Sequence, residues 1–264
     1  MILESNKVVL ARMRPLPKKE GVQKSASIEF LYGLNPAFEC LRARRRGVLE
    51  AHLNEQRANS SRLKTLRRLL DERGIPVHLT DKGRLHQLCG STEHQNTVLK
   101  TSRYPYVPFT NCLEADRVLL LDNVEDPHNV GAILRSSEVF GFHHILLPTR
   151  GVPEVYPSVS KVSAGAVEFL NIARDCNAVT YVQKALDAGY TVAALDARGD
   201  VPLDSFAREI PPRLLLVIGG EDKGVGQFIL NHATLTLAIP QKGRINSLNA
   251  SVAASLTLYA LRPD

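Results

Sequence analysis

Apolar runs of strand length alternate with helix-like segments along the second half of the chain. The runs, apolar at nearly every position, cover residues 117–123, 143–148, 191–195, 213–220 and 235–240. Segments with helical spacing cover residues 132–141, 158–170, 179–188, 227–233 and 250–261. Strands that are apolar throughout are typical of a sheet covered on both faces. Their alternation with helices predicts a mostly parallel, doubly wound α/β sheet.

The first half of the chain has the pattern of a smaller α/β domain. Strand-like runs cover residues 48–53, 75–80 and 96–102, and short helices are predicted after a turn at 33–36 and over 81–90. A longer helix, capped by Asn59 or Ser60 and stopped by Gly74, carries leucines on one side and basic residues on the other. We therefore expect a domain at residues 27–104, a proline-containing linker at 105–116 and a second domain at 117–264, after a basic arm at 1–26.

Composition narrows the class of protein. With 44% hydrophobic and 23% charged residues, the chain resembles an ordinary soluble protein, and no apolar run approaches the roughly 18 residues of a membrane helix. Four scattered cysteines without a C-x-x-C pair argue for reduced thiols and against a zinc site. We expect no membrane partner and no metal. The expected compartment is the cytoplasm, with the mitochondrial matrix as the alternative because the leader is basic.

Charge divides unevenly between the two halves. Residues 1–110 hold 20 of the 33 Lys and Arg but 10 of the 27 Asp and Glu, a net charge of +10, and the remainder has a net charge of −4. This asymmetry indicates a basic module that meets a polyanion, although a solvated basic surface would look the same. The candidate phosphate contacts are an arginine run and one helix face: Arg44, Arg45, Arg46, Arg62, Arg67 and Arg68.

Three polar loops directly follow predicted strands and should gather at one edge of the sheet, where ligands bind in open α/β folds. The first contains Asn129, with Arg135 six residues later, and a helix N-terminus beside an arginine suits a phosphate. The second, GGEDKGVG, matches no nucleotide-binding fingerprint, and its Glu221 could orient a polar group or cap a helix. The third places Ser247 and Asn249 before the last helix, where either could serve as its N-cap.

These loops resemble the three motifs of SPOUT-class RNA ribose 2′-O-methyltransferases of the SpoU/TrmH type. The matching stretches are DPHNVGAILRSSEVFG, LLLVIGGEDKGVG and LAIPQKGRINSLNASVAASL. The earlier FLYGLNPAFECL and EHQNTV are similar to the ribosomal-protein-like RNA-binding domain that precedes the catalytic domain in the large-subunit rRNA guanosine branch. Asn96 departs from that pattern, because those relatives usually carry glycine there.

The resemblance implies a catalytic domain with a deep C-terminal trefoil knot, active as a homodimer with S-adenosylmethionine as cofactor. It implies catalytic or positioning roles for Asn129, Arg135, Glu221, Ser247 and Asn249, with Arg135 at the phosphate of the target ribose. The residues that it implies for cofactor binding are Ile218, Gly219, Gly220, Ile239, Pro240 and Leu248.

The implied reaction is methylation of a ribose 2′-hydroxyl, most specifically on a guanosine of large-subunit rRNA. A tRNA ribose methyltransferase and a non-catalytic RNA-binding member of the fold are the alternatives. A nucleotide-dependent dehydrogenase is disfavoured because the G-x-G-x-x-G fingerprint is missing.

Overall fold

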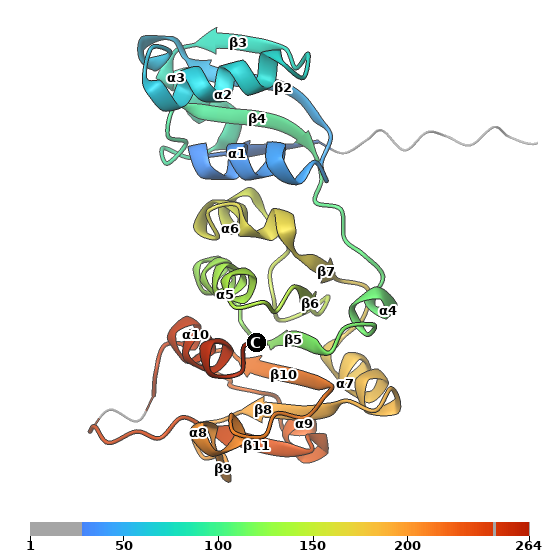
Figure 1. The fold of residues 1–264 in the computed structure, drawn as a ribbon. Helices are drawn as coiled ribbons and strands as arrows, with labels where there is room; N and C mark the ends of the chain where they lie inside the picture. Colours follow the sequence, from blue (N-terminus) through green and yellow to red (C-terminus); the bar gives the residue numbers. More distant parts are fainter. Residues whose placement is uncertain (1–27, 245–246, 264) are drawn as a thin grey trace, which may run out of the picture.

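The computed structural model describes residues 28–244 and 247–263, which form two α/β domains stacked end to end (Figure 1). The basic arm expected at residues 1–26 lies outside the described residues.

The N-terminal domain is a four-stranded sheet with helices packed on it. Its strands have the order β1-β4-β2-β3, in which only the β2–β3 pair is parallel among the described pairings. Of the leucines predicted to face inward, Leu63, Leu66 and Leu70 are buried and Leu69 is half-buried, and the basic residues of that helix face solvent. The elements are β1 (Ile28–Tyr32), α1 (Leu34–Ala43), β2 (Val48–Asn54), η1 (Glu55–Arg57), α2 (Ser61–Asp71), β3 (Val77–Thr80), α3 (Lys82–Cys89) and β4 (Thr97–Ser102).

Two of the positive-φ residues in this domain, Gly33 and Asn96, bear on the sequence predictions. Gly33, with φ 101°, lies between β1 and α1, where the chain enters a helix rather than the predicted turn. Asn96 has φ 65°, a left-handed conformation that glycine adopts freely and asparagine tolerates. The Asn54 side chain donates a hydrogen bond to Asn96 Oδ1 at 2.8 Å. The structure thus accommodates asparagine at a position where the resemblance leads us to expect glycine.

The C-terminal domain is a parallel, doubly wound sheet, as predicted. Its seven strands have the order β7-β6-β5-β10-β8-β11-β9, and every described pairing is parallel. The elements are α4 (Phe109–Cys112), β5 (Arg117–Asp122), α5 (Pro127–Val139), β6 (His144–Leu146), α6 (Pro157–Val162), η2 (Ala166–Phe169), β7 (Asn171–Ala173), α7 (Ala178–Asp187), β8 (Thr191–Leu195), β9 (Val201–Pro202), α8 (Leu203–Phe206), β10 (Leu214–Gly219), α9 (Gln227–His232), β11 (Leu235–Ala238) and α10 (Ala250–Ala260).

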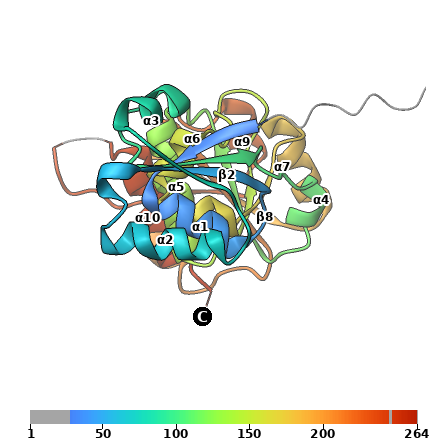
Figure 2. The ribbon, with the colours of Figure 1, turned by 90° about the horizontal axis from the view of Figure 1, so that it is seen from above.

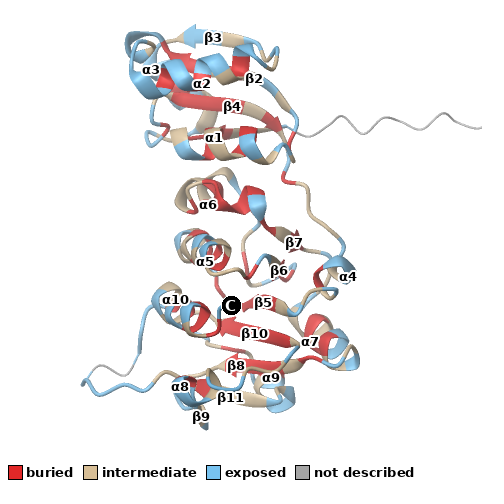
Figure 3. Cartoon of the chain, in the orientation of Figure 1, coloured by how far each residue is buried: buried red, intermediate tan, exposed pale blue. Residues whose placement is uncertain are grey.

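Alternate residues of the central strands fill two separate cores. Strand β10, at the middle of the sheet, is coloured mostly as buried in Figure 3. Leu119 and Leu121 of β5 pack on one face with α5, α6, α8 and α10. Val118 and Leu120 pack on the other face with α4, α7 and α9. A strand buried on both faces has no polar side, which explains its continuous apolar sequence.

The segment expected as a linker is packed against the C-terminal domain. Tyr104 is buried, and its hydroxyl contacts the carbonyl oxygens of Val167 and Leu170 at 2.9 and 2.7 Å. The Tyr106 hydroxyl accepts a hydrogen bond from Val155 N at 2.8 Å, and α4 follows. These contacts hold the connection in one place.

A buried ion cluster joins the two domains at the contact of β1 and α1 with α6 and η2. Arg46 is 5% exposed, and its Nη1 lies 2.8 Å from Glu29 Oε2. Its Nε lies 3.0 Å from an oxygen of Glu168, a residue of η2 with no exposed surface, and its Nη2 donates to Ser160 Oγ of α6 at 3.3 Å. Figure 2 views this stack from above, with α1 over α6 and α5.

This cluster corrects part of the predicted RNA-binding surface. The Arg46 guanidinium is surrounded by protein carboxylates, so its charge is not available to RNA phosphates. Arg45 is half-buried and donates a hydrogen bond to the carbonyl of Leu170 in the other domain. Of the arginine run, Arg44 alone is exposed among the described residues. The run carries charge, but two of its three members bind the C-terminal domain.

The described helices include none with the length and apolar character that crossing a bilayer requires. The trefoil knot stays a prediction, because the segment that would be threaded includes residues 245–246, which are not described.

Candidate active site

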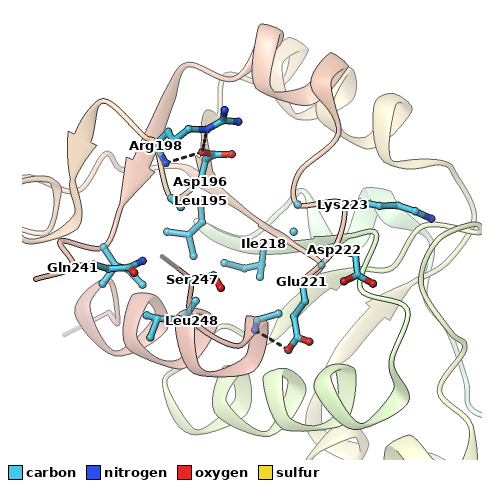
Figure 4. A pocket seen from close by; sticks show the side chains of 17 residues that line it. Leu195, Asp196, Arg198, Ile218, Glu221, Asp222, Lys223, Gln241, Ser247 and Leu248 are labelled. Atoms are coloured by element: carbon cyan, nitrogen blue, oxygen red, sulfur yellow. Dashed lines mark hydrogen bonds and ion pairs between the residues drawn. The ribbon is translucent and has the colours of Figure 1, made fainter. Parts of the chain in front are cut away.

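The polar loops predicted to carry chemistry meet at the carboxyl edge of the sheet. Strands β5, β10, β8 and β11 are neighbours, so the loops that follow them lie side by side. The loops after β10, β8 and β11, with the start of α10, enclose a cavity of about 320 Å³ (Figure 4). The predicted residues that line it are Ile218, Gly219, Gly220, Glu221, Ile239, Ser247 and Leu248. Pro240, also predicted to bind the cofactor, lies outside this lining.

Three polar side chains from the three loops are hydrogen-bonded to one another at the edge of this cavity. The Asn129 amide donates to Glu221 Oε1 at 3.1 Å, and the Asn249 amide donates to Asn129 Oδ1 at 3.0 Å. Asn249 also donates to Glu221 Oε1, which accepts a further bond from Ala250 N at 3.3 Å. Residues up to 120 positions apart thus form one polar cluster.

The helix ends explain how two of these residues are held. Asn249 is the N-cap of α10, and its Oδ1 accepts hydrogen bonds from the backbone N–H groups of Ser251 and Val252. Asn129 does not cap α5, because Asp126 fills that position and accepts from His128 N at 2.9 Å. The amide of Asn129 is therefore free to bind Glu221.

An Asn249→Asp variant separates the structural role of this residue from its role in the cluster. The aspartate oxygen still caps α10, but the second oxygen replaces an N–H donor and faces the Glu221 carboxylate. We expect near-normal thermal stability, with the methyl transfer that the resemblance implies reduced about 100-fold, because like charges push Glu221 out of position. Thermal unfolding and initial-rate assays on the same preparation check both statements. The Asn249→Ala variant, which removes the N-cap, is the reference for stability. If Asn249→Asp destabilises the protein as much as Asn249→Ala does, the two roles of this residue are not separable.

The glycines of the second loop have a packing role in addition to the cofactor contact that the resemblance implies. A Cβ atom at Gly219 would lie 2.3 Å from backbone atoms of Gly224 and Val225, and one at Gly220 would lie 1.9 Å from Asn123 O. These glycines let the loop fold back on itself and press against the loop after β5. They line the cavity, but close contact between protein backbones is what requires them.

Asp122, at the end of β5, fastens the same two loops and was not singled out from sequence. Its side chain is buried, and its Oδ2 accepts a hydrogen bond from Gly226 N at 2.8 Å. Burial raises the pKa of this carboxyl above its usual range. A polar residue at the end of a buried strand was the feature of the sequence that could have identified Asp122.

Arg135 lies apart from the cavity in this chain. It is exposed on α5 and does not line the cavity. The next residue, Ser136, contacts Ser255 of α10 with 2.7 Å between their hydroxyl oxygens, so Arg135 lies close to where α5 and α10 pack together. The catalytic role predicted for Arg135 stays a prediction.

The loop after β8 also lines the cavity, although sequence reasoning passed over it. Leu195, Asp196, Ala197 and Arg198 contribute to the lining. Asp196 Oδ1 accepts from Arg198 N at 2.8 Å, and the Arg198 side chain extends outward in Figure 4. The signal was present, because a polar stretch, DARGD, follows a predicted strand of the same parallel sheet.

Comparison with known families adds an independent observation. Residues 116–259 match the model of the SpoU rRNA Methylase family, and residues 30–107 match the model described as RNA 2′-O ribose methyltransferase substrate binding. The chain belongs to the SpoU rRNA methylase family.

Relatives of this SpoU family member share both domains. An uncharacterized tRNA/rRNA methyltransferase of Mycobacterium avium is 33% identical over 258 residues, which cover 94% of this chain and 81% of the relative. The SpoU methyltransferase AviRb of Streptomyces viridochromogenes, solved with AdoMet, has a TM-score of 0.73 at 22% identity, with 88% of each chain covered. An AdoMet-bound rRNA methyltransferase of Sinorhizobium meliloti has a TM-score of 0.72 at 20% identity, covering 89% of this chain and 86% of the other. These structures share the fold.

The predicted RNA-binding arginines that are exposed in this SpoU family member lie on the domain that matches the substrate-binding model. Arg67 and Arg68 form i,i+4 ion pairs at 3.8 and 3.5 Å with Asp71 and Glu72, and such surface pairs exchange readily for other anions. Arg62 donates to Asn35 Oδ1 at 2.6 Å. Contact of Arg44, Arg62, Arg67 and Arg68 with RNA stays a prediction. The described residues include no group of three or more His, Cys, Asp or Glu placed to hold a metal ion.

Proposed function

We propose that this protein transfers a methyl group from S-adenosylmethionine to a ribose 2′-hydroxyl in RNA, on a guanosine of large-subunit rRNA. The observation that carries the proposal is the cluster of Asn129, Glu221 and Asn249 at the edge of a ligand-sized cavity. Membership of the SpoU rRNA methylase family supports the reaction, and the substrate-binding match over residues 30–107 supports RNA as the substrate.

The cavity fits the cofactor in size and in chemistry. Its volume of about 320 Å³ falls within the usual range of small-molecule sites. Leu195, Ile218, Ile239 and Leu248 offer apolar surface for an adenine ring, and Ser247 offers a hydroxyl beside them. When bound, S-adenosylmethionine supplies a methyl group on a sulfonium, whose thioether is a good leaving group.

The residues of the chain would orient the acceptor hydroxyl. Among the described residues, the hydrogen bonds to the Glu221 side chain are all made to Oε1, which leaves Oε2 for a ligand donor such as a hydroxyl group. Asn129 and Asn249 fix the carboxylate before the substrate arrives, so little reorganisation is needed during the reaction. Ser247 lies on the opposite loop and would bind the cofactor or the ribose.

A homodimer built on α5 and α10 would complete the site. Val139, Val252, Leu256 and Tyr259 are exposed on these helices, with 63%, 47%, 46% and 54% of their surface accessible. Large apolar side chains gathered on one surface are typical of an interface. Arg135 lies on α5 beside this surface, so a two-fold dimer would direct it toward the partner protomer's cavity.

The test combines cofactor binding with methyl transfer by the full-length protein. Calorimetry should show binding of S-adenosylmethionine with competition by S-adenosylhomocysteine. With labelled cofactor and RNA from cells that lack the gene, label should appear in large-subunit rRNA as a 2′-O-methylated nucleoside. Label confined to tRNA would favour a tRNA methyltransferase. Cofactor binding without transfer to any RNA would favour a non-catalytic RNA-binding protein.

A further inference from the structure

A second cavity adjoins the first on the other side of the GGEDKGVG loop. It has a volume of about 170 Å³ and lies between the loop after β5 and the loop after β10. Residues 220–223 line both cavities, so one short segment separates them. Asn129 and Glu221 line the second cavity too. A methyl acceptor must lie within reach of the methyl donor, and this cavity offers such a place.

The charges of this second cavity limit what it can hold. Four carboxylates line it together with one ammonium: Glu125, Asp126, Glu221, Asp222 and Lys223. A phosphate would be repelled by this surplus of negative charge. The favoured ligand presents hydrogen-bond donors, because an ionised carboxylate only accepts.

Two of the four carboxylates already accept hydrogen bonds from groups within the protein. Asp126 caps α5, and Glu221 belongs to the polar cluster with Asn129 and Asn249. Glu125 instead reaches across the gap between the loops, and its Oε1 lies 2.6 Å from Lys223 Nζ. Both side chains of this pair are more than half exposed, so a ligand can displace water from them without unfolding any element. Figure 4 shows Lys223 pointing away from the first cavity.

We propose that the second cavity receives the base of the target nucleotide, and that Glu125 and Lys223 read it as guanine. This inference rests on the proposed function. The Watson–Crick edge of guanine carries two donors, N1–H and N2–H, beside the acceptor O6. The Glu125 carboxylate can accept hydrogen bonds from both donors while the Lys223 ammonium donates to O6. The negative group on the loop after β5 would thus face the donors of guanine, and the positive group on the loop after β10 would face its acceptor.

The other bases fit this pair less well. Adenine offers one donor and presents its ring acceptor N1 to the carboxylate. Uracil offers a single donor, N3–H, with a carbonyl oxygen on each side, so one carbonyl would face Glu125. Cytosine has one amino donor beside two acceptors. The enzyme would discriminate against these bases because, in the bound complex, a base acceptor would face the acceptor oxygens of Glu125 without a hydrogen bond between them.

The rival ligand for the same carboxylates is the ammonium group of the cofactor itself. An acidic cavity beside the first one would attract a cation equally well. The two possibilities differ in what a change at Glu125 does. Loss of a guanine contact lowers turnover on RNA, whereas loss of an ammonium contact weakens binding of S-adenosylmethionine.

The experiment uses the full-length protein and four RNA transcripts. After the methylated position has been mapped in RNA from cells that lack the gene, transcripts of that region are made with G, A, C or U at the position. The wild type should prefer G by about 100-fold or more in kcat/KM. Glu125→Gln should lower kcat/KM on the G transcript about 10- to 100-fold, the range for loss of one bidentate base contact. Its affinity for S-adenosylmethionine should stay within about twofold of wild type.

Two further variants sharpen the outcome. Lys223→Met should also lower activity on the G transcript, because it removes the donor to O6. Glu209→Gln, which removes the same charge from an exposed position away from both cavities, should leave the preference for G unchanged.

Full activity of Glu125→Gln on the G transcript would overturn the inference, as would a mapped target other than guanosine. Weaker binding of S-adenosylmethionine by Glu125→Gln, with the base preference kept, would assign the cavity to the cofactor instead. If the wild type methylates no RNA, the proposed function fails and this inference fails with it. That result is distinct from an active enzyme that is indifferent to Glu125.

Discussion

Arg135→Ala lowers methyl transfer by about 100- to 1,000-fold and leaves the affinity for S-adenosylmethionine within about twofold of wild type. The reason is position: Arg135 is exposed on α5 and does not line the first cavity, so we expect its guanidinium to serve the RNA rather than the cofactor. Arg135→Lys should recover little activity, because a point charge does not replace a planar fork at a phosphate. Single-turnover rates and calorimetry measure the two quantities. A parallel loss of cofactor affinity would contradict this assignment.

A mixed-dimer experiment tests which protomer supplies the arginine. If Arg135 acts in the partner's site, inactive Arg135→Ala protomers mixed with inactive Glu221→Gln protomers form dimers with one complete site. Random mixing should then restore roughly a quarter of wild-type activity, because half of the dimers are mixed and each has one working site. An arginine that serves its own protomer would give no recovery.

Arg46→Ala produces the largest expected loss of stability. The substitution leaves Glu168, fully buried in η2, without its main counter-charge, and breaking such a pair costs about 3–5 kcal/mol. Arg44→Ala, two residues away and exposed, is the matched control and should change stability by less than about 0.5 kcal/mol. Urea unfolding followed by far-UV circular dichroism compares the midpoints. A double variant with Arg46→Met and Glu168→Leu should lose less than Arg46→Ala, because it removes both buried charges.

The effect of Arg46→Ala should depend on pH. In the native protein, burial raises the pKa of Glu168, while the Arg46 guanidinium opposes that shift. Without the arginine the raised pKa rises further, and the folded variant favours the protonated carboxyl. A pKa raised in the folded state gives stability that is present below the unfolded pKa and lost as pH rises through the folded pKa. The deficit relative to wild type should therefore be smaller near pH 5 than near pH 8. An equal deficit at both values would show that Glu168 does not titrate in this range.

The long apolar runs predicted their strands well because burial on both faces leaves little choice of residue. β8 has the predicted bounds of Thr191–Leu195, and β5 and β10 differ from the prediction by one or two residues. β7 and β9, with three and two residues, were not predicted. Strands this short exist because a neighbour offers hydrogen bonds, and that information is absent from the local sequence.

Arginines were the residues that sequence placed least well. The leucine period of α2 showed which way Arg62, Arg67 and Arg68 face, and their exposure confirms it. The run at residues 44–46 lies between a helix and a strand, where no period applies. Its ion partner Glu168 is 122 residues away, so only the tertiary contact of two domains distinguishes Arg46 from a surface residue.

Sequence reasoning predicted the loops that carry recognisable motifs and missed the loop after β8. Asn129, Glu221 and Asn249 meet because β5 and β10 are neighbours and α10 returns beside them. The loop after β8 lies on the far side of β10, and no motif drew attention to it. Treating every polar loop after a parallel strand alike would have included Asp196 and Arg198.

The buried cluster around Arg46 fixes the position of one domain relative to the other. It therefore sets the distance between the basic face of α2 and the cavity at the sheet edge. If RNA binds the basic face of α2 as predicted, the enzyme would select its nucleotide by how far the target lies from the bound part of the folded RNA. A base pair inserted between those two parts would carry the target out of reach even with its neighbouring sequence intact. Correct folding of the RNA would thus become a condition of its methylation.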